Sequence, residues 1–116
     1  MEKPAVLQLS EDQLIAYNKC DIDAFCLCYH DDVCVMDESG TQTMVGMEEF
    51  RARYKSLFET YATDAWITER LLLPPHIVEK ERYVRRHRES GEETSGDIIV
   101  RYTEKDGKIA WVEFLR

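Results

Sequence analysis

The spacing of apolar residues in the first part of the chain predicts a helix that runs to Asn18. Its start has two alternatives. Pro4 suits the first position of a helix, whereas Ser10 and Gln13 could form a capping box that begins the helix later. Both alternatives place an amphipathic helix in the same part of the sequence.

A second helix and a strand are predicted directly afterwards. Asp21 is a good N-cap for a helix with Phe25 on its apolar face, and the polar residues 30–32 end that helix. The apolar residues 33–36 then form a short strand that stops at Asp37. A carboxylate at the end of a strand is a candidate for facing a cavity.

A third helix follows a turn at residues 38–42 and a short strand at residues 43–45. This helix is expected to begin directly after Gly46. Its apolar stripe combines five large side chains at helical spacing, namely Phe50, Tyr54, Leu57, Phe58 and Tyr61.

From Thr63 onward the apolar period changes from helical spacing to alternation. Strands are expected at residues 65–73, 76–88, 96–103 and 108–115, separated by turn residues. Helices followed by a long antiparallel meander predict an α+β fold, in which three N-terminal helices pack on a curved, mostly antiparallel sheet.

Length and composition limit the class of protein. The 116 residues fit one domain, spanning 1–116, with enough chain to form a core. A net charge of −8 argues against a nucleic-acid partner, because such binding depends on neutralising phosphates. No apolar stretch has the length of a membrane span or of a signal peptide, so no membrane association and a cytoplasmic location are expected.

The four cysteines lie close together at Cys20, Cys26, Cys28 and Cys34. Their spacing does not match a zinc site, and no secretory signal favours disulfides. We expect reduced thiols that act as small apolar residues, with a redox or metal role as the alternative. No metal and no cofactor are predicted.

Five segments carry a resemblance to a known family. They are residues 16–25, 29–37, 46–54, 81–82 and 106–112. In amino-acid sequence and order they resemble the nuclear transport factor two-like superfamily, and within it the SnoaL-like, or polyketide-cyclase-like, domains. The resemblance implies a cone-shaped pocket between helices and sheet, and commonly a homodimer through the outer surface of the sheet. It does not define a reaction, since this fold hosts isomerases, cyclases, dehydratases, epoxide hydrolases and non-catalytic binders.

Ketosteroid isomerase is the relative that can be compared residue by residue. Asp37 falls at the position of that family's general base. The oxyanion donors are missing, because Gln13 and Ile98 occupy their positions and Asp97 lies on the opposite face of its strand. One such donor is worth about 3 to 4 kcal/mol of barrier. Steroid isomerisation is therefore rejected as the activity.

The register of the superfamily, with strand alternation, predicts a pocket lining of aromatic and aliphatic residues. Such a lining suits an apolar or aromatic small molecule. The alternative is that these side chains fill the space themselves. The predicted residues are Tyr17, Asp37, Met44, Tyr54, Phe58, Trp66, Ile98, Val100, Tyr102, Val112 and Phe114.

Two carboxylates are candidates for chemistry. Asp37 would be a general base if burial raised its pKa; alternatively it begins the turn to Gly40 and accepts backbone hydrogen bonds there. Glu81 could reach into the pocket as a partner to Asp37, or could pair with Arg85 or Arg101.

Two functions follow as alternatives. The first is a cofactor-independent lyase, isomerase or hydrolase that uses Asp37 as general acid/base. The second is a non-catalytic ligand-binding or dimeric interaction module. In both, apolar residues on the convex face, among them Val84, Ile99 and Trp111, predict a homodimer through the sheet.

Overall fold

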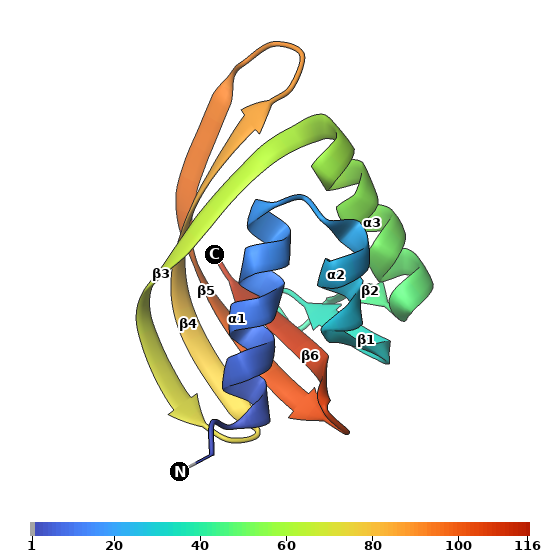
Figure 1. The fold of residues 1–116 in the computed structure, drawn as a ribbon, viewed down its shortest axis with the longest axis vertical. Helices are drawn as coiled ribbons and strands as arrows, with labels where there is room; N and C mark the ends of the chain where they lie inside the picture. Colours follow the sequence, from blue (N-terminus) through green and yellow to red (C-terminus); the bar gives the residue numbers. More distant parts are fainter. Residues whose placement is uncertain (1) are drawn as a thin grey trace.

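Three helices lie on one face of a six-stranded sheet in the computed structural model, which describes residues 2–116 (Figure 1). This arrangement confirms the predicted α+β class and the helices-first order. The elements are α1 (Ala5–Asn18), α2 (Ile22–Leu27), β1 (Tyr29–Met36), β2 (Gln42–Val45), α3 (Met47–Thr60), β3 (Tyr61–Leu73), β4 (His76–His87), β5 (Glu93–Lys105) and β6 (Lys108–Leu115).

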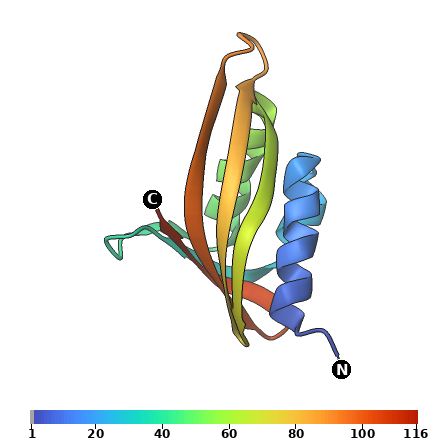
Figure 2. The ribbon, with the colours of Figure 1, turned by 90° about the vertical axis from the view of Figure 1, so that its left-hand side faces the viewer.

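The sheet has the strand order β2-β1-β6-β5-β4-β3. Every neighbouring pair is antiparallel except β1 and β6, which run parallel. Register shifts interrupt four of the five ladders and let the sheet bend. Figure 2 shows α1 along one face of the long strands β3 to β5.

The start of α1 agrees with the first of its two alternatives. Pro4 is the N-cap residue, and its carbonyl oxygen accepts hydrogen bonds from the backbone N–H groups of Leu7 and Gln8. The capping-box alternative is wrong, because Ser10 lies inside the helix. There its buried hydroxyl donates to Glu79 on β4.

The boundary between α2 and β1 differs from the prediction. Asp21 caps α2 as expected, accepting a hydrogen bond from Ala24 N at 3.1 Å. The helix ends at Leu27, however, and β1 begins at Tyr29 rather than at residue 33. Tyr29 pairs with Ile109 of β6, so tertiary pairing overrides the local polar signal of residues 30–32.

The core between helices and sheet is rich in aromatic rings. Phe25 of α2 and Phe50 of α3 stack with centroids 5.7 Å apart, and Tyr29 and Tyr54 pack against both rings. This cluster fixes α2 and α3 to each other and to β1. All four cysteines are free thiols, and three of them are buried.

No helix within residues 2–116 combines the length and the apolar character that crossing a membrane requires.

Candidate functional site

A cavity of about 340 Å³ opens between the helices and the concave face of the sheet. Its volume lies within the range of small-molecule sites. Its wall combines apolar side chains with several ionisable ones. Of the residues predicted to line a pocket, the wall contains Tyr17, Asp37, Met44, Tyr54, Glu81, Ile98, Tyr102 and Phe114.

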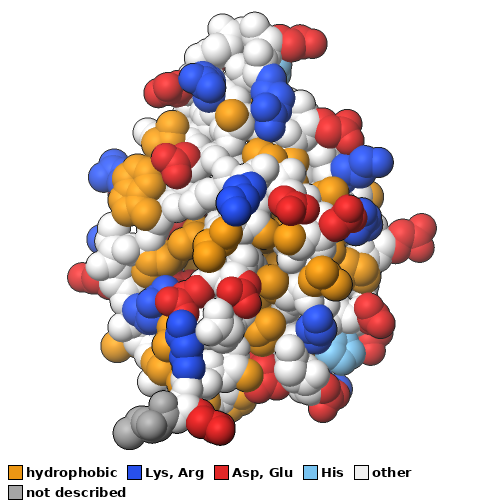
Figure 3. Space-filling model, viewed as in Figure 1, with side chains coloured by type: hydrophobic (Ala, Val, Ile, Leu, Met, Phe, Trp, Pro, Cys, Tyr) orange, Lys and Arg blue, Asp and Glu red, His pale blue; other side chains and the backbone are white. Residues whose placement is uncertain are grey.

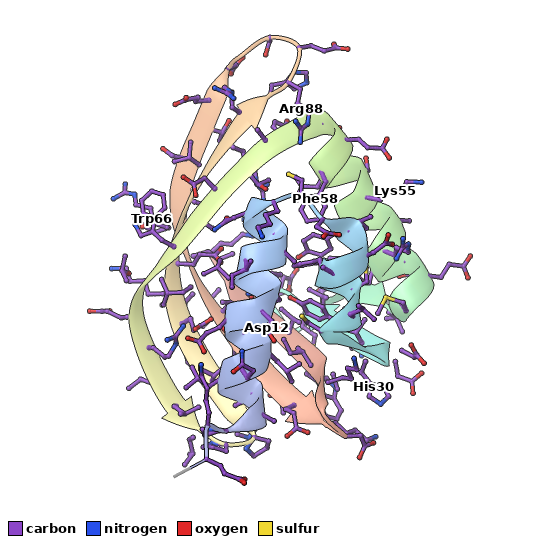
Figure 4. The ribbon with its side chains drawn as sticks, viewed as in Figure 1. Asp12, His30, Lys55, Phe58, Trp66 and Arg88 are labelled. Carbon is purple, nitrogen blue, oxygen red and sulfur yellow. The ribbon has the colours of Figure 1, made fainter. Side chains whose placement is uncertain are left out.

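Four predicted lining residues lie elsewhere. Phe58, Val100 and Val112 are buried in the core and do not line the cavity. Trp66 is 42% exposed and extends from β3 away from the helices, so its predicted inward orientation is wrong (Figure 4). On β3 the buried side chain is that of the preceding Ala65, which places Trp66 on the outer face.

Asp37 belongs to the turn between β1 and β2. Its Oδ1 accepts hydrogen bonds from Ser39 N at 2.9 Å, Ser39 Oγ at 2.6 Å and Thr41 N at 3.1 Å. The hydrogen bond from the Ser39 hydroxyl is the main cause that lowers the pKa of this carboxyl. The condition for a general base, a pKa raised by burial, is therefore not met at Asp37, and the geometry agrees with the turn alternative.

Glu81 is the carboxylate that lies within the cavity wall. Strand alternation on β4 places it on the concave face, opposite Ile67 of β3 and Ile98 of β5. Burial, reinforced by the negative charge of Glu79, raises the pKa of Glu81 to about 7, although Arg85 and Arg116 oppose the shift. A carboxyl with this pKa can both accept and release a proton at neutral pH.

Neither of the expected ion pairs of Glu81 forms. Arg101 points to the outer face and pairs with Glu113 at 3.8 Å. Among residues 2–116, no ion pair includes Glu81 or Arg85. The carboxyl is therefore not committed to a structural salt bridge.

Four tyrosines surround this carboxyl from four different elements. Burial raises the pKa of each hydroxyl, and a negative charge on Glu81 adds to the effect, so all four remain neutral at physiological pH. They are Tyr17 on α1, Tyr29 on β1, Tyr54 on α3 and Tyr102 on β5. Neutral phenols can donate hydrogen bonds to a ligand oxygen.

Gln13 also lines the cavity, but its amide is occupied within the protein. Its Oε1 accepts a hydrogen bond from the Tyr29 hydroxyl at 2.9 Å, and its Nε2 donates to Ser10 O at 3.1 Å. The amide thus holds Tyr29 in place, which leaves it poorly suited to act as an oxyanion donor.

Several lining residues were not predicted to face the pocket, among them Tyr83 and Arg85, although Arg85 was considered as an ion-pair partner of Glu81. The Arg85 guanidinium lies over the Tyr83 ring, 5.1 Å from the centroid, and both side chains line the cavity. Both share a strand face with Glu81, so alternation along β4 would have found them. Within residues 2–116, no group of three or more histidine, cysteine or carboxylate side chains could hold a metal ion.

Comparison with known proteins identifies the family. Residues 11–112 match the SnoaL-like domain, so the chain belongs to this family and the expected resemblance is confirmed. No match is found among curated proteins.

Solved structures share the fold at low sequence identity. A cystatin-fold protein from Novosphingobium aromaticivorans superimposes with a TM-score of 0.87 at 21% identity, covering 99% of this chain and 100% of that one. A Mycobacterium tuberculosis LEH-like epoxide hydrolase gives 0.84 at 11%, with coverages of 96% and 81%. Rv0760c of the same organism, in complex with estradiol-17beta-hemisuccinate, gives 0.85 at 15%, with coverages of 97% and 93%.

Proposed function

We propose that this protein is a cofactor-independent enzyme that performs acid–base chemistry on an apolar or aromatic small molecule, with Glu81 as the general acid/base. The observation that carries the proposal is the position of the Glu81 carboxyl in the cavity wall with a pKa of about 7. A group with such a pKa exchanges protons efficiently at neutral pH. Lyase, isomerase and hydrolase reactions all use this step.

The surrounding tyrosines support the same proposal. A base that removes a proton creates negative charge on the substrate, and neutral hydroxyl donors around it can stabilise that charge. Tyr54 and Tyr102 line the same cavity as Glu81 and come from opposite sides, α3 and β5. An oxygen of the substrate bound between them would lie close to the carboxyl.

A non-catalytic ligand carrier is the second candidate. It is favoured by the hydrogen bonds of Gln13, which remove one potential oxyanion donor from the cavity. In that case Glu81 would serve only to select ligands.

The test of the proposed function is conversion of small molecules of three classes, one for each reaction: apolar epoxides, enolisable ketones and β-hydroxy carbonyl compounds. Native mass spectrometry of the purified protein first selects those that bind, and product formation is then followed by chromatography. We expect one class to be converted with a rate that changes around pH 7, since Glu81 titrates there. Asp37→Asn should affect the rate far less than Glu81→Gln. Binding without turnover in any class would favour the carrier.

We also propose that the protein forms a homodimer through the outer face of the sheet. Trp66, Ile99 and Trp111 expose between 40% and 42% of their surface there, and Leu71 exposes 74%. A sheet face of this kind is typical of an interface between two copies.

Light scattering coupled to gel filtration checks the dimer at micromolar concentration. We expect twice the 13.6 kDa mass for the wild-type chain and the single mass for Ile99→Glu. Leu27→Glu is the matched control, since Leu27 is 68% exposed on α2, on the helical side of the molecule. A wild-type monomer, or a dimer that Ile99→Glu leaves intact, would contradict this interface. Cytoplasmic location and the lack of nucleic-acid or membrane partners stay predictions of the sequence.

A further inference from the structure

The balance of basic and acidic side chains in the cavity wall differs from that of the whole chain. The protein carries a net charge of −8, and acidic and basic side chains mix over the helical face (Figure 3). The cavity wall, in contrast, contains three arginines, Arg53, Arg85 and Arg116, against two carboxylates. One of these is Asp37, which is bound to its own turn, and the other is Glu81, whose raised pKa favours the neutral form. The cavity is therefore electropositive within an acidic protein.

Arg85 is central to this positive charge. It lies on the concave face of β4, where its guanidinium stacks over Tyr83 at 5.1 Å. The other two arginines are exposed, whereas Arg85 is half-buried. Shielding from water strengthens the attraction that a guanidinium exerts on an anion.

Arg85 faces Glu81 across the cavity wall, but no carboxylate of the described residues lies within ion-pair distance of its guanidinium. Within residues 2–116 its buried Nε also has no hydrogen-bond partner. Its neighbour Tyr17 interacts with the guanidinium but cannot balance the charge, because burial raises the pKa of that hydroxyl and keeps it neutral. An unpaired, partly buried guanidinium is costly, and in a cavity wall the natural explanation is a ligand that supplies the missing anion.

The remaining wall defines the rest of the ligand. Phe25, Met44, Ile98 and Phe114 provide aromatic and aliphatic surface in the same cavity. A ligand that satisfies both parts has an apolar ring system and one anionic group. Carboxylates and phosphates both accept two parallel hydrogen bonds from the planar fork of a guanidinium. A single half-buried guanidinium is balanced by the one charge of a carboxylate, whereas a phosphate monoester carries about two charges at neutral pH.

We propose that the cavity binds a small aromatic or alicyclic carboxylic acid, with the carboxylate on Arg85 and the ring against the apolar wall. This inference rests on the proposed function for the identity of the site, and it adds the chemical class of the substrate. The carboxylate is the group that anchors the molecule. Glu81, four residues before Arg85 on the same face of β4, then meets the ring or the carbon chain.

Proton uptake should accompany binding. Glu81 is faced by Glu79, Arg85 and Arg116, and by the hydroxyls of Tyr17, Tyr29, Tyr54 and Tyr102. A ligand carboxylate adds a negative charge to this group and favours the neutral form of Glu81. Affinity for the acid should therefore fall above neutral pH, where Glu81 must take up a proton. Glu81→Gln should remove this dependence.

Titration calorimetry with two probes of the same shape tests the proposal. The probes are 2-naphthoate and its neutral analogue 2-naphthalenemethanol. At pH 6 we expect the wild-type protein to bind the acid about tenfold or more tightly than the alcohol, the range of one charge-assisted pair. Arg85→Met should abolish this preference, because it weakens binding of the acid at least tenfold more than binding of the alcohol.

The matched control is Arg82→Met, because Arg82 lies on the same strand but on the outer face, beside Asp97 at 3.9 Å. It should keep the preference, and thermal unfolding checks that each variant is folded. Equal affinity for the two probes, no binding of the acid, or a preference that survives in Arg85→Met would overturn the proposal. None of these results depends on turnover, so the acid–base role of Glu81 is tested separately by the turnover assay.

Discussion

Glu81→Gln is expected to lower the catalytic efficiency about 100-fold or more while making the folded protein more stable at alkaline pH. Glutamine keeps the size of the side chain but cannot accept or release a proton. A purely structural residue would lose stability when replaced. Loss of activity together with a gain of stability is thus the signature of a carboxyl held in the cavity for its chemistry.

The gain in stability has a defined pH dependence. The pKa of Glu81 rises from 4.5 to about 7 on folding. Below pH 4.5 the carboxyl is protonated in both states and does not lower the free energy of unfolding. The free energy of unfolding falls as the pH rises from 4.5 to 7, because the unfolded state ionises more easily, and the full loss is reached above pH 7. A shift of this size corresponds to about 3 kcal/mol in the free energy of unfolding.

Urea unfolding at pH 4 and pH 8 measures this difference. We expect Glu81→Gln and wild type to have similar free energies of unfolding at pH 4, and the variant to be more stable by about 3 kcal/mol at pH 8. The matched control is Asp64→Asn, which replaces an exposed carboxylate on β3 and should leave the free energy of unfolding unchanged at both pH values. A destabilised Glu81→Gln at pH 8 would contradict the account.

Glu79→Ala is expected to destabilise the protein by about 3 kcal/mol. The Glu79 side chain is fully buried, and it accepts hydrogen bonds from Ser10 Oγ at 2.5 Å and from Arg70 Nε at 2.6 Å. It therefore links α1, β3 and β4 beneath the cavity. Its removal leaves the Ser10 hydroxyl buried without a partner and frees Arg70. The change in the midpoint of urea unfolding measures the loss.

Glu79→Gln separates the charge of this residue from its packing. The negative charge of Glu79 is one of the causes that raise the pKa of Glu81. Glutamine should therefore lower the pKa of Glu81 and shift the pH–rate profile toward acid. Glu92→Gln, an exposed control in the hairpin between β4 and β5, should leave the profile in place. An unchanged profile in Glu79→Gln would show that burial alone sets the pKa.

Much of the fold could be predicted from the sequence because it depends on local periodicity. The apolar stripe of α3, the Asp21 cap and the alternation after Thr63 each act over a few residues. The prediction was wrong at Tyr29, where β1 begins early because β6, eighty residues later, pairs with it. Pairing at this distance leaves no local signal.

The candidate site was harder to predict because burial decides it. Asp37 and Glu81 both lie where a carboxylate can reach the cavity, and alternation alone does not distinguish them. The hydrogen bonds of Ser39 and Thr41 lower the pKa of Asp37, whereas the packing around Glu81 raises its pKa. Trp66 shows the related problem of strand phase, since a shift of one residue moves a side chain to the other face.

Titration of the Glu81 carboxyl shows whether this group can exchange protons at neutral pH. The pKa can be measured by ¹³C NMR of glutamate-labelled protein between pH 3 and pH 9, with the Glu81 signal assigned by its absence in Glu81→Gln. We expect a midpoint of about 7 for this carboxyl. A midpoint at the ordinary value of 4.5 would contradict this expectation.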